Sequence, residues 1–217
     1  MLHFTLSSEK DRPLGLLCLG AHADDIEIGS GGTILRLLDE RPNTVVRWVV
    51  FSGSGQRAIE ARTSAAALLD RNPSSRVDVL SFRDGYFPFQ GAAIKDFFET
   101  LKRDFEPSLI LTHRKDDAHQ DHRLVSELTY QTFRDHLILE YEIPKYESDL
   151  ANPNVFVPLT RAQLARKIDT VTRCFASQHA RSWFTEETFM GLARLRGLSC
   201  RAPDGLAEAF HVQKVVL

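Results

Sequence analysis

Short apolar segments alternate along the chain with segments whose apolar residues recur every three or four positions. Five of the short segments are apolar or β-branched at nearly every position: 14–19, 45–51, 77–80, 108–112 and 137–141. Such continuous runs are typical of strands that are buried on both faces, as in a parallel sheet. The pattern therefore predicts five strands of a mostly parallel sheet.

Two later segments show the period of an amphipathic helix. The first places on one helix face Ile94, Phe97, Phe98, Leu101 and Phe105, and the second Leu164, Ile168, Val171 and Phe175. Strands that alternate with helices predict βαβ units with right-handed crossovers. We therefore expect a Rossmann-like α/β fold with helices on both faces of the sheet. No repeat or linker interrupts the pattern, which predicts a single domain over residues 1–217.

The chain after the fifth predicted strand is less regular. Residues 142–158 contain three prolines and two asparagines without a clear period, which predicts a surface loop. Long loops in compact domains are often functional, so the role of this one is left open. Thr160 is expected to cap the helix that follows, and residues 210–217 are expected to form a last strand.

Composition narrows the class of protein. The 217 residues suffice for one sizeable core, and 43% hydrophobic with 26% charged residues is typical of a globular protein. A formal net charge of -2 offers no basic surface for nucleic acid, and no apolar run approaches the ~20 residues of a membrane span. Three scattered cysteines and an N-terminus without a secretory pattern predict a cytoplasmic location. Homo-oligomerisation stays open.

The candidate chemistry lies in two clusters of histidines and aspartates. The first spans residues 21–33, directly after the first predicted strand, and holds His22, Asp24 and Asp25 ahead of three glycines. Side chains alternate along an extended backbone, so the two aspartates are expected to face different partners. The glycines are expected to let the chain turn tightly from this cluster into the next helix.

The second cluster spans residues 113–122, directly after the fourth predicted strand. His119 and His122 are three apart at the start of a predicted helix, which puts them on one side of it. Asp121 between them is placed to orient an imidazole. Asp117 and Asp121 are both expected to favour the charged form of His119.

The first and fourth strands of such sheets commonly flank the point where the strand order reverses, and ligands bind there. We therefore expect His22, Asp25 and His122 to lie close together. Imidazole and carboxylate ligands of this kind form open catalytic zinc sites. One of the two adjacent aspartates can then bind the metal while the other accepts a proton from the attacking water. The alternative for each cluster alone is a polar loop whose aspartates cap helices.

The two clusters resemble the motifs of a known family. Residues 21–33 resemble the "AHPDDE…GGT" motif, and residues 113–122 the "H…D.HPDH" motif, of the PIG-L/LmbE family of zinc-dependent N-acetyl-sugar deacetylases. Shorter matches occur over most of the chain, among them an "R..E" pair and a "DG" pair. Three positions depart from the motifs, since Ala23 and Gln120 replace proline and Ile26 replaces glutamate.

The resemblance implies one zinc ion per chain, with Fe²⁺ or Co²⁺ as alternatives. The implied ligands are His22, Asp25 and His122. Asp24 becomes the general base, His119 the group that stabilises the oxyanion and assists the leaving amine, and Asp121 a support for these residues. Apart from the resemblance, Arg57 and Asp84 lie near predicted strand ends or loop starts, which makes them candidate contacts for a small-molecule substrate. The alternative for each is an exposed charge or a helix salt bridge.

The expected activity is removal of the acetyl group from an N-acetylated sugar or sugar conjugate by zinc-activated water. Two alternatives stay open. One is an amidase that acts on a non-sugar conjugate, such as a thiol adduct. The other is a sugar- or nucleotide-binding module that has lost its metal, although the presence of every expected ligand and of the base speaks against that.

Overall fold

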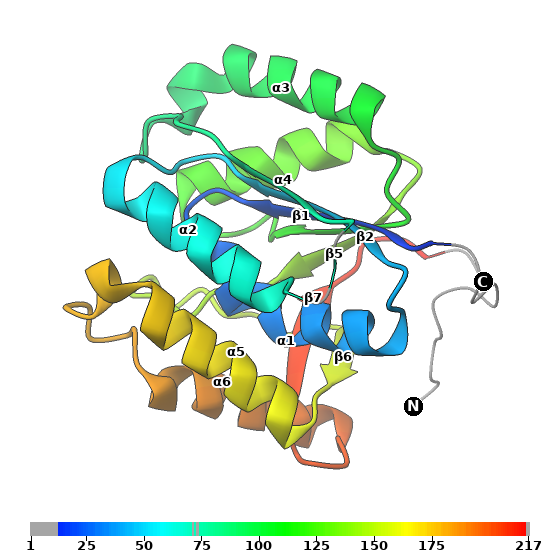
Figure 1. The fold of residues 1–217 in the computed structure, drawn as a ribbon, viewed down its shortest axis with the longest axis vertical. Helices are drawn as coiled ribbons and strands as arrows, with labels where there is room; N and C mark the ends of the chain where they lie inside the picture. Colours follow the sequence, from blue (N-terminus) through cyan, green and yellow to red (C-terminus); the bar gives the residue numbers. More distant parts are fainter. Residues whose placement is uncertain (1–12, 71, 73, 216–217) are drawn as a thin grey trace.

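The computed structural model describes residues 13–70, 72 and 74–215, and these form one α/β domain around a seven-stranded sheet (Figure 1). The strand order is β3-β2-β1-β4-β5-β7-β6. The five parallel strands are β1 (Gly15–Gly20), β2 (Val45–Val50), β3 (Arg76–Val79), β4 (Leu109–His113) and β5 (Leu137–Tyr141). At one edge, β7 (Ala207–His211) pairs antiparallel with both β5 and β6 (Val155–Pro158). The predicted fold class is confirmed.

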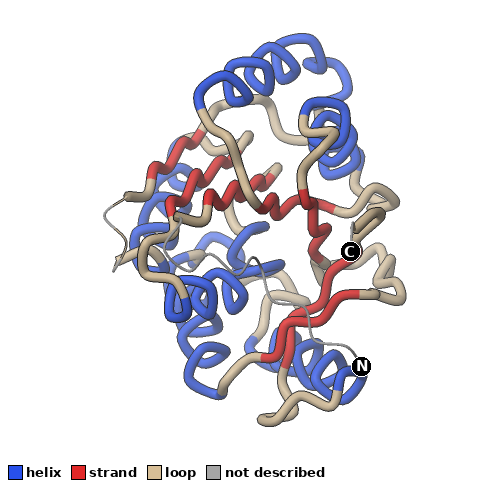
Figure 2. Tube along the Cα trace, turned by 90° about the vertical axis from the view of Figure 1, so that its right-hand side faces the viewer, coloured by secondary structure: helices blue, strands red, loops and turns tan. Residues whose placement is uncertain are grey.

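Helices cover both faces of the sheet, as the view in Figure 2 shows. One face carries α1 (Asp25–Glu40), α2 (Gly55–Leu68), α5 (Arg161–Cys174) and α6 (Glu186–Cys200). The other carries α3 (Gly91–Asp104) and α4 (Gln120–Thr132). Each face has its own hydrophobic core, because alternate residues of β1 point to opposite sides: Leu16 and Cys18 into one core, Leu17 and Leu19 into the other.

The elements with a strong pattern were predicted well. Each of the five predicted strands begins and ends within one residue of the observed strand, and β5 matches at both ends. The predicted helix faces lie in α3 and α5. Thr160 caps α5 as expected, since its side chain accepts the N–H of Gln163 while the Gln163 side chain accepts the N–H of Thr160.

Two predictions for the last third of the chain were wrong. The segment 142–158 is not loop throughout, because it ends in the strand β6. This edge strand is only four residues long and partly buried, so its apolar run is limited to Val155, Phe156 and Val157, and Pro158 is tolerated at its end. The last strand covers Ala207–His211 rather than 210–217, and residues 216–217 lie outside the described part of the chain. Residues 1–12, where the sequence predicts no secretory signal, also lie outside it.

The glycines of the first cluster lie inside α1, not in a turn before it. A Cβ atom at Gly29 would lie 2.3 Å from the ring of Tyr141, and one at Gly32 would lie 2.4 Å from Leu159. The glycines thus allow α1 to pack tightly against Tyr141 at the end of β5 and against Leu159 just after β6.

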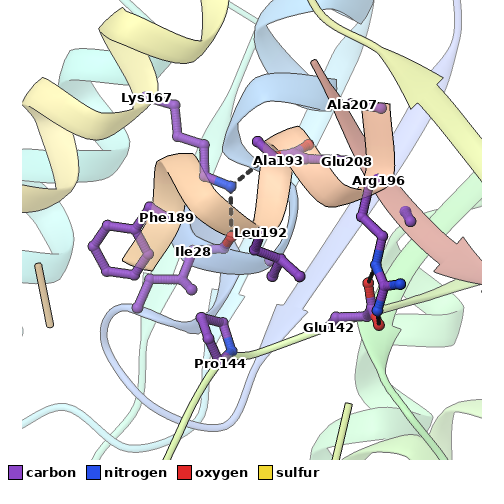
Figure 3. A pocket seen from close by; sticks show the side chains of 12 residues that line it. Ile28, Glu142, Pro144, Lys167, Phe189, Leu192, Ala193, Arg196, Ala207 and Glu208 are labelled. Carbon is purple, nitrogen blue, oxygen red and sulfur yellow. Dashed lines mark hydrogen bonds and ion pairs between the residues drawn. The ribbon is translucent and has the colours of Figure 1, made fainter. Parts of the chain in front are cut away.

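The C-terminal part of the chain holds α1 in place. The Glu208 carboxylate accepts the backbone N–H groups of Gly32 and Thr33 at 2.9 and 2.6 Å. Lys167 binds both that carboxylate and the carbonyl of Ile28, each at 2.6 Å, beside a small cavity between α1, α6 and β7 (Figure 3). In the described part of the chain, no helix combines the length and apolarity that crossing a membrane requires.

Candidate functional site

The two clusters meet at the carboxyl ends of β1 and β4, which pair directly with each other. Nδ1 of His22 lies 3.1 Å from Nε2 of His122 and 3.4 Å from Oδ2 of Asp25, and Nε2 of His122 lies 3.5 Å from the same Oδ2. Donor atoms around a tetrahedral zinc ion, at 2.0–2.2 Å from the metal, are about 3.3–3.6 Å apart. The donor types fit zinc, and the two sides that involve Asp25 lie within this range, whereas the His22–His122 side, at 3.1 Å, is slightly shorter.

The local structure holds these groups at helix starts. Asp25 is the first residue of α1, and its Oδ2 accepts the backbone N–H of His22 at 2.7 Å. His122 lies in the first turn of α4. All three side chains are largely shielded from solvent, so a cation bound between them would be held in a poorly hydrated environment.

A carboxylate fixes the outer nitrogen of each imidazole. Nε2 of His22 lies 3.0 Å from Oδ1 of Asp84, and Nδ1 of His122 lies 3.0 Å from Oδ2 of Asp117. Because a carboxylate only accepts, these outer nitrogens carry ring protons. Burial acts to lower the pKa of His22, but its bonds to Asp121, Asp25 and Asp84 raise that pKa well above its usual value, so without a cation the inner nitrogen of His22 carries a proton as well. Carboxylate–histidine pairs of this kind are typical of metal centres.

The segment after β3 is held against the site by Asp121. Its Oδ2 accepts the N–H of Gly85 at 2.7 Å, and its Oδ1 accepts that of Phe87 at 3.1 Å. The Gln120 side chain also binds the carbonyl of Gly85. Asp121 is 3.4 Å from Nε2 of His22, so it supports His22 mainly by fixing the segment that carries Asp84.

Asp24 and Asp25 face different partners, as expected. Arg57 Nη2 donates to Oδ1 of Asp24 at 2.8 Å, whereas Oδ2 of Asp25 lies 3.2 Å from Nε2 of His113. Burial raises the pKa of Asp24, and the Asp25 charge adds to this while Arg57 opposes it. Burial also acts to raise the pKa of Asp25, but His122 and His113 hold that pKa well below its usual value.

The predicted substrate contacts Arg57 and Asp84 thus already have partners inside the site. Arg57 is also held by Glu60, whose Oε2 lies 3.3 Å from Nη1. The side chains of Arg57 and Asp84 remain 26% and 74% exposed, so both still line the approach to the cluster.

His119 lies against both candidate histidine ligands, with ring centroids 4.8 Å from His22 and 4.7 Å from His122. It is the N-cap of α4, and its Nδ1 accepts the backbone N–H of Asp121 at 3.2 Å. Burial and the charge of His22 lower the pKa of His119, and they outweigh Asp121 and Asp117, which act to raise it as expected. The expected charged form is therefore not favoured, because the capping bond needs a lone pair and the helix N-terminus is electropositive.

Asp117 bonds the ring of a second histidine besides acting on the charge of His119. Its Oδ2 binds the ring of His122, while its Oδ1 accepts only the backbone N–H of His119 at 2.7 Å. Burial disfavours the Asp117 carboxylate, but the bond and charge of His122 lower its pKa well below the usual value. Burial and the nearby His113 lower the pKa of His122 to about 4, which keeps this imidazole neutral.

His113 is the site residue for which the sequence suggested no role. It is the last residue of β4, it is fully buried, and its ring stacks on that of His122 at 3.9 Å. With Asp25 and His122 it forms a further candidate donor set. Two other sets lie beside it, His22 with His119 and His122, and His22 with Asp84, His119 and Asp121. Its position could have indicated a role, because it is a polar residue at the carboxyl end of a strand beside the switch in strand order, where ligands bind.

Comparison with known proteins matches this region to one family. The family model described as "PIG-L: GlcNAc-PI de-N-acetylase" matches residues 17–133, which include every candidate site residue. No curated protein sequence matches the chain.

Several solved structures share the fold. A conserved protein from Thermus thermophilus is 20% identical, with a TM-score of 0.74 over 94% of this chain and 96% of that one. The N,N'-diacetylchitobiose deacetylase from Pyrococcus horikoshii is 19% identical, with a TM-score of 0.70 over 97% and 87%. The 4-carboxy-2-hydroxymuconate hydratase GalB from Pseudomonas putida is 17% identical, with a TM-score of 0.74 over 94% and 98%. At these identities the similarity shows a common fold, and one fold can serve different reactions.

Proposed function

Because the chain belongs to the PIG-L family, we propose that it is a metal-dependent deacetylase acting on an N-acetylated sugar or sugar conjugate, with one catalytic domain over residues 1–217. The observation that carries this proposal is the triangle of Nδ1 of His22, Oδ2 of Asp25 and Nε2 of His122, with sides of 3.1–3.5 Å. These residues would hold one zinc ion, with Fe²⁺ or Co²⁺ as alternatives.

When bound, zinc supplies a Lewis acid for the acetamide carbonyl and lowers the pKa of a water molecule towards about 7. Asp24 accepts the proton of the attacking water. Its Oδ1 is engaged by Arg57, so we assign proton transfer to Oδ2. The raised pKa of Asp24 suits a general base, because a pKa nearer the working pH gives a better proton acceptor. The same carboxyl can then pass the proton to the leaving amine.

His119 acts as a neutral hydrogen-bond donor in this proposal. Its Nδ1 accepts the N–H of Asp121, which leaves the proton on Nε2. That N–H can stabilise the negative charge that develops on the carbonyl oxygen. Asp121 keeps Asp84 and His22 in place, and Arg57 and Asp84 line the approach of the sugar. Neither motif contains a serine or cysteine nucleophile beside a base, which favours direct attack by water.

The test is incubation of the zinc-loaded protein with N-acetylhexosamines, nucleotide-linked N-acetyl sugars and non-sugar amides, including thiol conjugates. We expect equal amounts of free amine and acetate from a sugar substrate. In ¹⁸O-labelled water the acetate should carry the label, and no acetylated protein should accumulate. Turnover confined to non-sugar amides would assign the amidase alternative, and a protein that binds no metal would contradict the proposal.

A further inference from the structure

The segment 142–154, which joins β5 to β6, reaches the surroundings of the candidate metal site through Lys145 and Asp149. The Lys145 ammonium is largely buried, with 9% of its side chain exposed. It lies 2.6 and 2.7 Å from the two oxygens of Asp149 and 3.2 Å from Oδ2 of Asp117. Asp149 in turn accepts the backbone N–H of Ala118 at 2.7 Å. The lysine thus connects the segment to the loop between β4 and α4.

Through Asp117, Lys145 lies one residue away from a candidate metal ligand. The oxygen that Lys145 contacts, Oδ2, is also the one that accepts the ring proton of His122 at 3.0 Å. The other oxygen accepts the backbone N–H of His119. The Asp117 carboxylate is therefore held at three points, and only one of them, Lys145, comes from outside the second cluster.

We infer that Lys145 is a positioning residue for the metal centre: through Asp117 it fixes the ring of His122 in the orientation that presents Nε2 to the ion. The inference rests on the proposed function, since it assumes that His122 binds the metal. Without the ammonium, the Asp117 and Asp149 carboxylates would face each other across a buried space, and like charges there are costly. Asp117 would turn away, and His122 would lose its alignment.

The segment has other anchors that should keep it folded without Lys145. Arg196 Nη2 binds Oε1 of Glu142 at 2.6 Å and the carbonyl of Ala151 at 3.1 Å. At its far end, the side chain of Asn154 accepts the N–H of Val212 at 2.9 Å. Loss of Lys145 is thus expected to affect the orientation of His122 more than the fold.

The experiment measures the zinc dissociation constant of the full-length protein by competition with a chromophoric chelator. Removing a group that orients a metal ligand typically costs 10–100-fold in affinity. Lys145→Met acts one residue further out, so we expect a loss of about tenfold, near the lower end of that range. The visible spectrum of the Co²⁺-substituted protein should shift, and Lys145→Arg should restore both properties in part.

The controls separate this role from a general loss of structure. Lys95→Met removes a similar lysine–carboxylate pair from the outside of α3 and should leave zinc affinity unchanged. If Lys145 acts through Asp117, the double variant Lys145→Met/Asp117→Asn should bind zinc no more weakly than Asp117→Asn alone. Should Lys145→Met fail to fold, Lys145→Gln, which removes the charge but keeps a polar side chain, gives the same comparison.

Wild-type zinc affinity and an unchanged cobalt spectrum in Lys145→Met would overturn the inference. His122→Ala distinguishes that result from failure of the proposed function. If His122→Ala loses the metal while Lys145→Met keeps it, the metal centre stands and the inference alone is wrong. If both variants bind zinc like the wild type, the metal site of the proposed function is wrong as well.

Discussion

At the scale of single residues, two adjacent carboxylates have opposite environments. Asp25 lies among three imidazoles, which hold its pKa low, whereas Asp24 is buried beside Asp25 with one arginine as counter-charge, and its pKa is raised. Pairs of titratable groups whose pKa values are pushed apart in this way are typical of acid–base catalysis. Asp25, with its lowered pKa, stays charged and can bind a cation, whereas Asp24, with its raised pKa, can accept a proton.

These different environments predict that Asp24→Asn and Asp25→Asn impair different properties of the protein. Asp24→Asn should retain about one zinc per chain and lose ~10²–10⁴-fold in kcat, the usual effect of removing a general base. Asp25→Asn should lose the zinc itself, because a neutral amide replaces the only carboxylate of the ligand triangle. Elemental analysis and steady-state kinetics measure the two effects. Near-normal turnover by Asp24→Asn would show that another group accepts the proton.

A second residue-scale prediction concerns Asp84, whose exposed carboxylate binds the outer nitrogen of His22. Asp84→Asn should weaken zinc binding by ~10–100-fold, because the amide holds the proton on Nε2 less firmly. The melting temperature of the metal-free protein should hardly change, since the side chain is 74% exposed. A raised KM with unchanged zinc affinity would instead assign Asp84 to the substrate, the role that the sequence alone suggested.

At the scale of elements, the close packing of α1 on β5 predicts a large effect from a small change. Gly29→Ala would place a methyl group 2.3 Å from the Tyr141 ring, and this ring is fully buried with its hydroxyl bonded to the carbonyl of Leu19. Overpacking of this kind costs about 1–3 kcal/mol in the free energy of unfolding. Urea denaturation of the metal-free protein measures it.

The matched control is Gly91→Ala at the start of α3, where the added methyl group has no neighbour within 4 Å. Gly91 already has helical backbone angles, so alanine should leave stability unchanged or raise it by up to about 1 kcal/mol. If Gly29→Ala were as stable as Gly91→Ala, the fit of α1 against Tyr141 would be looser than the structure indicates.

The elements also explain which parts of the fold the sequence could predict. Strands β1, β2 and β4 are buried along almost their whole length, so their apolar runs mark them clearly. The apolar run of the edge strand β6 is only three residues long and lies between two prolines, and α6 exposes Leu195 and Leu198, so neither element is marked clearly. The spacing of apolar residues marks an element only when one of its faces is buried in the core. Elements at the margin of the core bury few side chains, so their sequences show little of this spacing.

The site could be predicted as far as its motifs reach. The meeting of His22 with His122 follows from strand order, because β1 and β4 are neighbours at the switch point. The partners of the polar groups do not follow, because they depend on rotamers and on loops from elsewhere. No pattern in the chain indicates that Asp117 would hold the ring of His122, nor that Lys145 would reach Asp117 from the loop after β5.

At the scale of the whole molecule, the proposed metal joins two halves of the chain. Its ligands come from the loop after β1 and the first turn of α4, a hundred residues apart. The C-terminal strand holds α1 from the other side, because Glu208 accepts two N–H groups of that helix. The first motif is thus fixed both by the second motif and by the end of the domain, so metal binding should be coupled to the stability of the complete fold.

The last prediction follows from this coupling. A ligand that binds only the folded state stabilises it by RT ln(1 + [L]/Kd), which is about 2.7 kcal/mol at a free zinc concentration of 100 times Kd. Urea denaturation at fixed free zinc should show this gain in the wild type, and it should disappear in His122→Ala. His179→Ala is the matched control, because His179 is exposed and its ring hydrogen-bonds only the Thr172 carbonyl among the described residues. If His122→Ala gained as much stability from zinc as the wild type, the stabilising ion would bind elsewhere on the molecule.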